Sequence, residues 1–239
     1  QKMKILITGI NGAVGSTLVT GLKDKYQLRG LDLESNPNVP DTLIGSVADF
    51  DTVFTAIQDM DVVIHLANSG SAAIGERQQN AGIDLLPSEN FVGIYNLLEA
   101  ARQNGVRRFV YASRAGLLSP YPQSIFRTID MMPRPESYYS VSKAFGEDLG
   151  YMYTSQSELE FVAVRIGNFN RDRPEPEHPH HLGHADTVHL FEQAVIHPNV
   201  KFEIVFGVSD STWNLYDLDH GRKAIGYYPK QKSNIEPNI

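Results

Sequence analysis

Short apolar runs rich in β-branched residues alternate with longer stretches of helical periodicity along most of the chain. This alternation predicts βαβ units, because strands that are hydrophobic on both faces are typical of a parallel sheet covered by helices. Strands are expected at Lys4–Thr8, Gln27–Leu31, Val62–Leu66, Arg108–Ala112, Phe161–Ile166 and Lys201–Phe206. Helices are expected between them at Val14–Lys25, Phe50–Gln58, Glu89–Asn104, Tyr139–Ser157 and Thr187–Ile196. The pattern predicts an α/β fold with a doubly wound parallel sheet, the Rossmann arrangement.

A chain of 239 residues with 41% hydrophobic residues can bury one sizeable core, so a single domain over residues 1–239 is expected.

Three segments lack the alternation of strands and helices. Arg114–Ser137 carries four prolines and follows a central strand, and a loop at the carboxyl end of such a strand is expected to line the ligand site. Residues 167–186 and 209–239 are expected to form a small cap on the substrate side.

Composition excludes several classes of function. The net charge is −7, so the chain lacks the basic surface that nucleic acid or an anionic membrane would require. It contains no cysteine, which removes disulfides, thiolate nucleophiles and cysteine-bound metals. The apolar runs are far shorter than the ~20 residues that span a bilayer, and the first residues lack a signal-peptide pattern. A cytoplasmic location is therefore expected.

A glycine motif directly follows the first strand. Gly9, Gly12 and Gly15 form the pattern G-x-x-G-x-x-G and open a helical stretch. Glycines at this place let the backbone turn tightly and approach a pyrophosphate at the helix N-terminus. Asp32 ends the second strand, where a carboxylate would accept both ribose hydroxyls and repel a 2′-phosphate. The combination predicts NAD as the cofactor, against the weaker alternative of a simple turn and a solvated Asp32.

Tyr139 and Lys143 form a Y-x-x-x-K pair at the start of a predicted helix. Residues four apart share a helix face, so the phenol and the ammonium can converge on one ligand. A nearby cation is expected to lower the pKa of the phenol, which would make Tyr139 a general acid and base. The alternative is a half-buried aromatic residue beside a surface charge, and the position of the pair between the fourth and fifth strands favours catalysis.

Together these motifs resemble the extended short-chain dehydrogenase/reductase family, the NAD-dependent epimerase/dehydratase group. The resemblance covers residues 3 to about 170 and includes the H-L-A segment Ile64–Asn68 and the helix Asn90–Ala101. It implies that Lys143 grips the nicotinamide ribose. Ser46 stands where the family usually has an adenine-contacting Asp, so that contact is expected to be weaker or replaced by the Val47 backbone. The cofactor-binding residues implied are Gly9, Asn11, Gly12, Ala13, Val14, Gly15, Asp32, Leu33, Ser46, Val47, Leu66, Ala67, Asn68, Tyr139, Lys143 and Ile166.

The family's third catalytic group, a Ser or Thr that ends the fourth strand, is missing. Arg114 occupies the aligned position, and Ser113 lies one residue early, on the other face of an extended chain. Ser113 could replace the missing hydroxyl if the strand end bulges or turns, so the candidate catalytic residues are Tyr139, Lys143 and Ser113. Arg114 would present a fork of donors to a carboxylate or a developing alkoxide, which suggests an acidic substrate. Alternatively, it points to solvent or pairs with Asp130 or Glu136.

Within the family, three segments most resemble uronate dehydrogenases, which oxidise C1 of a hexuronic acid to a lactone: Arg134–Tyr139, Val164–Asn168 and Trp213–Asp217. The resemblance implies substrate contacts at Arg114, Asn168 and Ser69. About 70 residues follow the fifth expected strand, Phe161–Ile166, which leaves little room for the substrate domain of the sugar-nucleotide epimerases.

The resemblance thus predicts an NAD-dependent oxidoreductase that transfers hydride to or from a hydroxyl carbon of a small sugar or sugar acid. One alternative is a sugar or nucleotide-sugar epimerase or dehydratase, and a second is a catalytically degenerate NAD-binding protein. A homo-oligomer is expected, with a dimer favoured.

Histidines cluster late in the chain, with six of the eight between positions 178 and 197. Such clusters can bind Zn²⁺, but this one lies in a proline-rich stretch without the H-E-x-x-H helical spacing. A solvated loop is the favoured interpretation, and no metal is expected.

Overall fold

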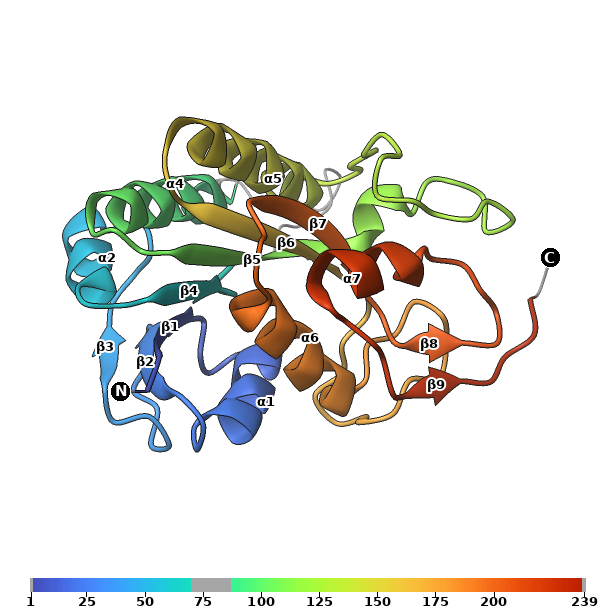
Figure 1. The fold of residues 1–239 in the computed structure, drawn as a ribbon, viewed down its shortest axis with the longest axis horizontal. Helices are drawn as coiled ribbons and strands as arrows, with labels where there is room; N and C mark the ends of the chain where they lie inside the picture. Colours follow the sequence, from blue (N-terminus) through green and yellow to red (C-terminus); the bar gives the residue numbers. More distant parts are fainter. Residues whose placement is uncertain (1, 70–86, 238–239) are drawn as a thin grey trace, which may run out of the picture.

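A parallel seven-stranded sheet forms the centre of the computed structural model, which describes residues 2–69 and 87–237 (Figure 1). The order β3-β2-β1-β4-β5-β6-β7 confirms the doubly wound arrangement, since the chain runs outward from β1 to β3 and then returns to place β4 on the other side of β1. The strands are β1 (Lys4–Thr8), β2 (Gln27–Asp32), β3 (Thr42–Ile44), β4 (Val62–His65), β5 (Arg108–Arg114), β6 (Glu160–Ile166) and β7 (Phe202–Gly207).

Helices cover both faces of the sheet (Figure 1). One layer contains α2 (Phe50–Ile57), α4 (Ser88–Gln103) and α5 (Tyr138–Gln156), and the opposite face carries α1 (Ala13–Leu22), α6 (His184–Ile196) and α7 (Leu218–Ile225). Within the described part of the chain, no helix combines the length and the apolar character needed to cross a bilayer.

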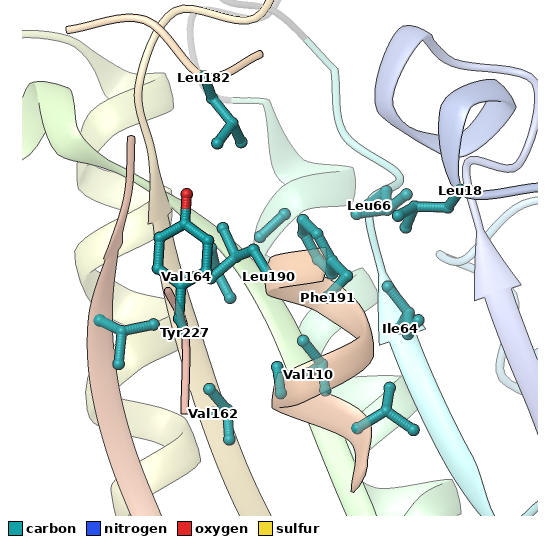
Figure 2. Close-up of a cluster of buried hydrophobic side chains, with 14 of the residues drawn as sticks. Leu18, Ile64, Leu66, Val110, Val162, Val164, Leu182, Leu190, Phe191 and Tyr227 are labelled. Atoms are coloured by element: carbon teal, nitrogen blue, oxygen red, sulfur yellow. The ribbon is translucent and has the colours of Figure 1, made fainter. Parts of the chain in front are cut away.

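Each face of the sheet has its own buried hydrophobic cluster, because alternate residues of a strand point to opposite faces. On the α6 side, Leu190 and Phe191 lie in one cluster with the strand residues Val110, Val162 and Val164 (Figure 2). On the α5 side, the rings of Phe109 and Phe161 stack with their centroids 5.7 Å apart. The two clusters hold the sheet rigid and so fix the positions of the strand ends.

Several short elements were absent from the sequence prediction, which counted six strands and five helices. The edge strand β3 has only three residues, too few to show a period. The pair β8 (Asp210–Ser211) and β9 (Lys232–Ser233) is shorter still, and η1 (Ala115–Leu118) is a single 3₁₀ turn. Helix α7 did carry terminal signals, because Asp217 accepts a hydrogen bond from the N–H of His220 and Gly226 ends the helix at φ 70°.

Three irregular segments meet at the carboxyl edge of the sheet. The loop after β5 joins the C-terminal segment through a bridge between Arg127 and Tyr216, and the segment after β6 folds back on itself through a bridge between Asn168 and His181. These local pairings give the loops defined positions above the strand ends, where ligands bind in sheets of this topology.

Truncation of Leu190 tests the contribution of the α6 layer. Leu190→Ala should lower the free energy of unfolding by about 2–5 kcal/mol, because the fully buried side chain leaves a cavity against the sheet. Ile196→Ala, on the same helix but 42% exposed, is the matched control and should change stability by no more than about 0.5 kcal/mol. Equal midpoints for the two variants in urea unfolding would contradict this account of the core.

Candidate active site

Two adjoining cavities of about 560 and 430 Å³ open at the carboxyl edge of the sheet. They share the lining residues Gly9, Gly12, Leu66 and Asn68, which come from the ends of β1 and β4. β1 and β4 are neighbours in the sheet, and the chain continues from β1 toward β2 on one side and from β4 toward β5 on the other. The cavities therefore occupy the topological switch point of the sheet.

The glycine motif forms the floor between the two cavities. Gly9 has φ 69°, and a Cβ there would lie 2.7 Å from the backbone nitrogen of Ala67. A Cβ on Gly15 would lie 2.5 Å from the carbonyl oxygen of Gly9. Gly12 is more open, with 3.2 Å to the nearest atom, and it precedes α1 without a side-chain cap. The first amides of α1 are therefore available to a phosphate group.

Asp32 is held at the end of β2 by two backbone amides. Its Oδ2 accepts from the N–H of Asn11 at 2.9 Å, and its Oδ1 accepts from the N–H of Leu33 at 2.7 Å. The carboxylate lines the smaller cavity together with Leu33. Asn11 lies outside both cavity walls and ties the glycine turn to the segment after β2, with its side chain donating to the carbonyl of Glu34. Asp32 is thus oriented to accept hydrogen bonds from a ribose.

The other residues implied for cofactor binding surround these two anchors. In the smaller cavity, the side chain of Ser46 accepts from the N–H of Ala48 and the Val47 carbonyl accepts from Asn96. The remaining positions line one or both cavities, and they are Ala13, Val14, Leu66, Ala67, Asn68 and Ile166. A glycine floor, a carboxylate at one end and free helix amides between the cavities fit a dinucleotide such as NAD.

Tyr139 and Lys143 lie in the first turns of α5 and line the larger cavity. The helix begins at this place because Ser137 caps it, accepting from the N–H of Ser140 at 3.1 Å. The ammonium of Lys143 is buried, donates to the carbonyl of Ala112 at 2.7 Å and lies 5.3 Å from the centroid of the Tyr139 ring.

The pKa values of this pair differ from the expectation that Lys143 lowers the pKa of Tyr139. Burial raises the pKa of Tyr139 above its ordinary value, and Arg114 is the charge that pulls it back in part. Burial, and then the charge of Arg114, lower the pKa of Lys143 to about 7. The expected lowering of the Tyr139 pKa by Lys143 is thus wrong, because both groups are desolvated and desolvation disfavours their charged forms.

Arg114 turns toward the catalytic pair. Its Nη1 donates to the hydroxyl of Ser140 at 3.1 Å, and its guanidinium carbon lies 5.2 Å from the centroid of the Tyr139 ring. Gly116 makes room for it, since a Cβ there would lie 2.4 Å from the Nε of Arg114. The described residues show no ion pair from Arg114 to either Asp130 or Glu136. Arg114 thus lines the larger cavity and presents its charge beside the phenol.

Ser113 lines the larger cavity, but its hydroxyl is already hydrogen-bonded within the protein. β5 pairs regularly with β6 as far as Arg114, so the strand end has no bulge. The hydroxyl of Ser113 donates to Glu147 at 2.6 Å, and Glu147 in turn accepts two hydrogen bonds from Arg165. This buried network links β5 and β6 to α5 beside the larger cavity.

The residues proposed for substrate contact lie in different cavities. Asn168 lines the larger cavity, where its backbone is held by the carbonyl of His180. Ser69 lines the smaller cavity, and its backbone N–H and carbonyl are both paired with the side chain of Asn90. Ser69 therefore lies on the side of the cofactor-binding residues, at the edge of the described chain.

Sequence reasoning missed several residues of the larger cavity. They come from the loops after β5 and β6 and from the C-terminal segment, and they are Ser119, Gln123, Arg127, Phe169, His180 and Tyr216. The proline-rich loop was expected to line the ligand site, but no spacing rule connects Arg127 with Tyr216 across almost 90 positions.

The histidine-rich segment is packed rather than fully solvated. His180 is half-buried, its Nδ1 and the Tyr216 hydroxyl lie 2.6 Å apart, and its ring stacks with that of His178. Burial, followed by the charges of His178, Arg127 and His181, lowers the pKa of His180 to about 4. Over the described ranges, no three His, Asp or Glu side chains gather in a group that could hold a metal ion.

Known proteins resemble this chain in sequence and in fold. Residues 5–185 match the model of the NAD dependent epimerase/dehydratase family. The NAD-dependent glucose-6-phosphate dehydrogenase of Haloferax volcanii is 32% identical over 96% of this chain and 94% of that protein. The uronate dehydrogenase of Pseudomonas syringae pv. tomato is 31% identical over 97% of this chain and 83% of that protein. A mutant uronate dehydrogenase from Agrobacterium tumefaciens, solved with NAD, superposes with a TM-score of 0.83 at 29% identity, covering 97% of this chain and 86% of that one.

The carboxylate of Asp32 should set the choice of cofactor. NAD(H) should bind at least about tenfold more tightly than NADP(H), a difference of ~1.4 kcal/mol, because the 2′-phosphate would approach a fixed negative charge. Asp32→Ala should narrow this ratio, whereas Asp24→Ala, an exposed carboxylate just before β2, should leave it unchanged. Isothermal titration calorimetry with both cofactors is the measurement, and equal affinities in the wild type would contradict the assignment.

Proposed function

This chain belongs to the NAD-dependent epimerase/dehydratase family, and on that basis we propose that it is an oxidoreductase that transfers hydride to or from a hydroxyl-bearing carbon of a small sugar or sugar acid. The observation that carries the proposal is the pair of half-buried Tyr139 and buried Lys143, which lines the same cavity as the glycine motif with Arg114 beside the phenol.

The chemistry divides between the cofactor and the chain. When bound, NAD⁺ supplies a nicotinamide carbon that accepts hydride. In the oxidation direction, the phenolate of Tyr139 takes the hydroxyl proton of the substrate while the C–H bond at the same carbon breaks and a carbonyl forms. In the reverse direction, Tyr139 returns that proton to the oxygen. Lys143 donates one N–H to the carbonyl of Ala112, which holds its side chain at the wall of the cavity and leaves its remaining donors for a ligand.

Arg114 takes the place of the missing hydroxyl in this proposal. A guanidinium next to Tyr139 can donate to the reacting oxygen, and its positive charge stabilises that oxygen as it becomes an alkoxide. The hydrogen bond to Ser140 and the space above Gly116 hold the guanidinium in this position. The substitution therefore exchanges a neutral donor for a charged one and keeps the catalytic step.

The two alternatives differ from this proposal in a directly measurable way. An epimerase or dehydratase returns the hydride within one catalytic cycle, so it produces no net NADH. A degenerate binding protein would bind NAD without turnover of any sugar. Accumulation of NADH absorbance with a panel of aldoses and sugar acids distinguishes the proposed dehydrogenase from both.

Loss of the phenol should abolish most activity. Tyr139→Phe should lower kcat by about two or more orders of magnitude, because the proton of the substrate then has no acceptor. The affinity for NAD, measured by calorimetry, should stay nearly unchanged and serves as the control for folding. Unchanged kcat in this variant would remove Tyr139 from the mechanism.

Removal of the guanidinium should change both the rate and its pH dependence. Arg114→Met should lower kcat/KM by about 10²–10³-fold, as expected when a donor to the reacting oxygen is lost. Since Arg114 lowers the pKa of Tyr139, its removal raises that pKa, and the rise of the oxidation rate with pH should move to higher pH. An unshifted pH profile with a normal rate would mean that Arg114 has no part in the reaction.

A further inference from the structure

Arg127 is a buried cation without a neutralising partner. The residue is 1% exposed. Its Nη2 donates to the carbonyl of Tyr121 at 3.0 Å and its Nη1 to the carbonyl of Ile125 at 3.3 Å. In the part of the chain that the structure describes, its Nε has no hydrogen-bond partner and no carboxylate forms an ion pair with it. A buried charge in this condition costs free energy, which a bound anion would offset.

A second buried arginine shows how this chain neutralises such a charge elsewhere. Arg108, at the opposite end of β5, is also fully buried and also has one nitrogen without a partner. Its Nε, however, lies 2.8 Å from a carboxylate oxygen of Glu160, and it borders neither cavity of the site. Arg127 lacks such a carboxylate and lines the larger cavity instead.

The surroundings hold Arg127 in one orientation. Its backbone N–H donates to the carbonyl of Leu215 at 2.9 Å, and its carbonyl accepts from the N–H of Asp217 at 2.9 Å. Its guanidinium lies 5.6 Å from the centroid of the Tyr216 ring. The hydroxyl of Tyr216 is hydrogen-bonded to His180 at 2.6 Å, and both of these residues line the same cavity. We call Arg127, His180 and Tyr216 the Arg127 subsite.

The charge of the larger cavity has one sign. Its described lining contains three basic residues, Arg114, Arg127 and Lys143, and no Asp or Glu. His180 is neutral near pH 7, because burial and its charged neighbours lower its pKa to about 4, so it offers a hydrogen bond without a charge. A ligand with an anionic group is therefore favoured here over a neutral one.

We propose that the Arg127 subsite binds the acidic group of the sugar, a carboxylate or a phosphate ester, at the part of the substrate remote from the reacting carbon. The inference rests on the proposed function and deepens it, because it divides the two cavity arginines between two tasks. Arg114 lies beside Tyr139 and acts on the reacting oxygen. Arg127, packed on the Tyr216 ring, selects substrates that carry an oxyanion, because its planar guanidinium lies at the wall of the cavity and has no carboxylate partner among the described residues.

The test compares three sugars that differ in one substituent: glucose, glucuronate and glucose 6-phosphate. Each is titrated by calorimetry into the full chain with NADH present, and each is assayed for turnover with NAD⁺. The wild type should bind one of the two anionic sugars at least about tenfold more tightly than glucose, and the preferred one identifies the acidic group as a carboxylate or a phosphate ester.

Arg127→Met should reduce both the affinity and the kcat/KM for that preferred sugar by at least about tenfold. The affinity and the kcat/KM for glucose should change much less. Arg114→Met should instead lower kcat/KM for all substrates by similar factors. Arg134→Met is the matched control, because Arg134 lies in the same loop over the ring of Tyr121 and does not line the cavity. It should leave the preference intact.

The guanidinium of Arg127 donates to two carbonyls of its own loop, so Arg127→Met can disturb that loop. A second variant therefore tests the subsite without removing these contacts. Tyr216→Phe keeps the ring under Arg127 but removes the hydroxyl, and it should weaken binding of the preferred anionic sugar several-fold while the protein remains folded. Wild-type affinity for both anionic sugars in folded Arg127→Met would overturn the inference and make Arg127 a structural cross-link of the loop.

The two levels of the proposal fail separately. Selective binding of an anionic sugar that depends on Arg127, without formation of NADH, would support the subsite and refute the proposed dehydrogenase. Formation of NADH from all three sugars at similar kcat/KM would support the dehydrogenase and refute the subsite.

Discussion

The close approach of the first turn to the end of β4 is the constraint on which the rest of the site depends. The hydroxyl of Thr8 accepts from the N–H groups of Leu66 and Ala67, both at 3.2 Å, and shares a 2.7 Å hydrogen bond with the buried His65. Gly9 follows with its left-handed backbone against Ala67. With the two strand ends held together, α1 and the chain after β4 leave on opposite sides, and the dinucleotide-binding cavities open between them.

A second constraint is electrostatic. Burial makes the charged forms of Tyr139 and Lys143 unfavourable, and Arg114 influences both pKa values. A neutral serine in place of Arg114 would leave the phenolate without this support. The space above Gly116 and the hydroxyl of Ser140 hold the guanidinium in place. The network of Ser113, Glu147 and Arg165 holds the strand end from the other side, so the exchange of a hydroxyl for an arginine is accommodated by several neighbours.

The end of the larger cavity that we propose for the acidic group of the sugar is built from segments without regular structure. The loop after β5, the segment after β6 and the C-terminal segment contribute Arg127, His180 and Tyr216, and backbone bridges fix the first and the last to each other. The end of β5 and the start of α5 supply Arg114, Tyr139 and Lys143 at the reactive end of the cavity, while these loops add the buried charge of Arg127.

The sequence by itself determined six of the seven strands of the sheet, its doubly wound arrangement and the positions of the motif residues on it. Those features depend on local rules: hydrophobic periodicity, glycine at tight turns, and residues four apart on a helix face. These rules were sufficient to place Gly9, Asp32, Tyr139 and Lys143. Only the tertiary structure decided the direction of Arg114, the commitment of Ser113 to Glu147 and the meeting of Arg127 with Tyr216. Each of these depends on contacts between distant segments, and the pKa of Tyr139 depends on burial, which no spacing in the sequence encodes.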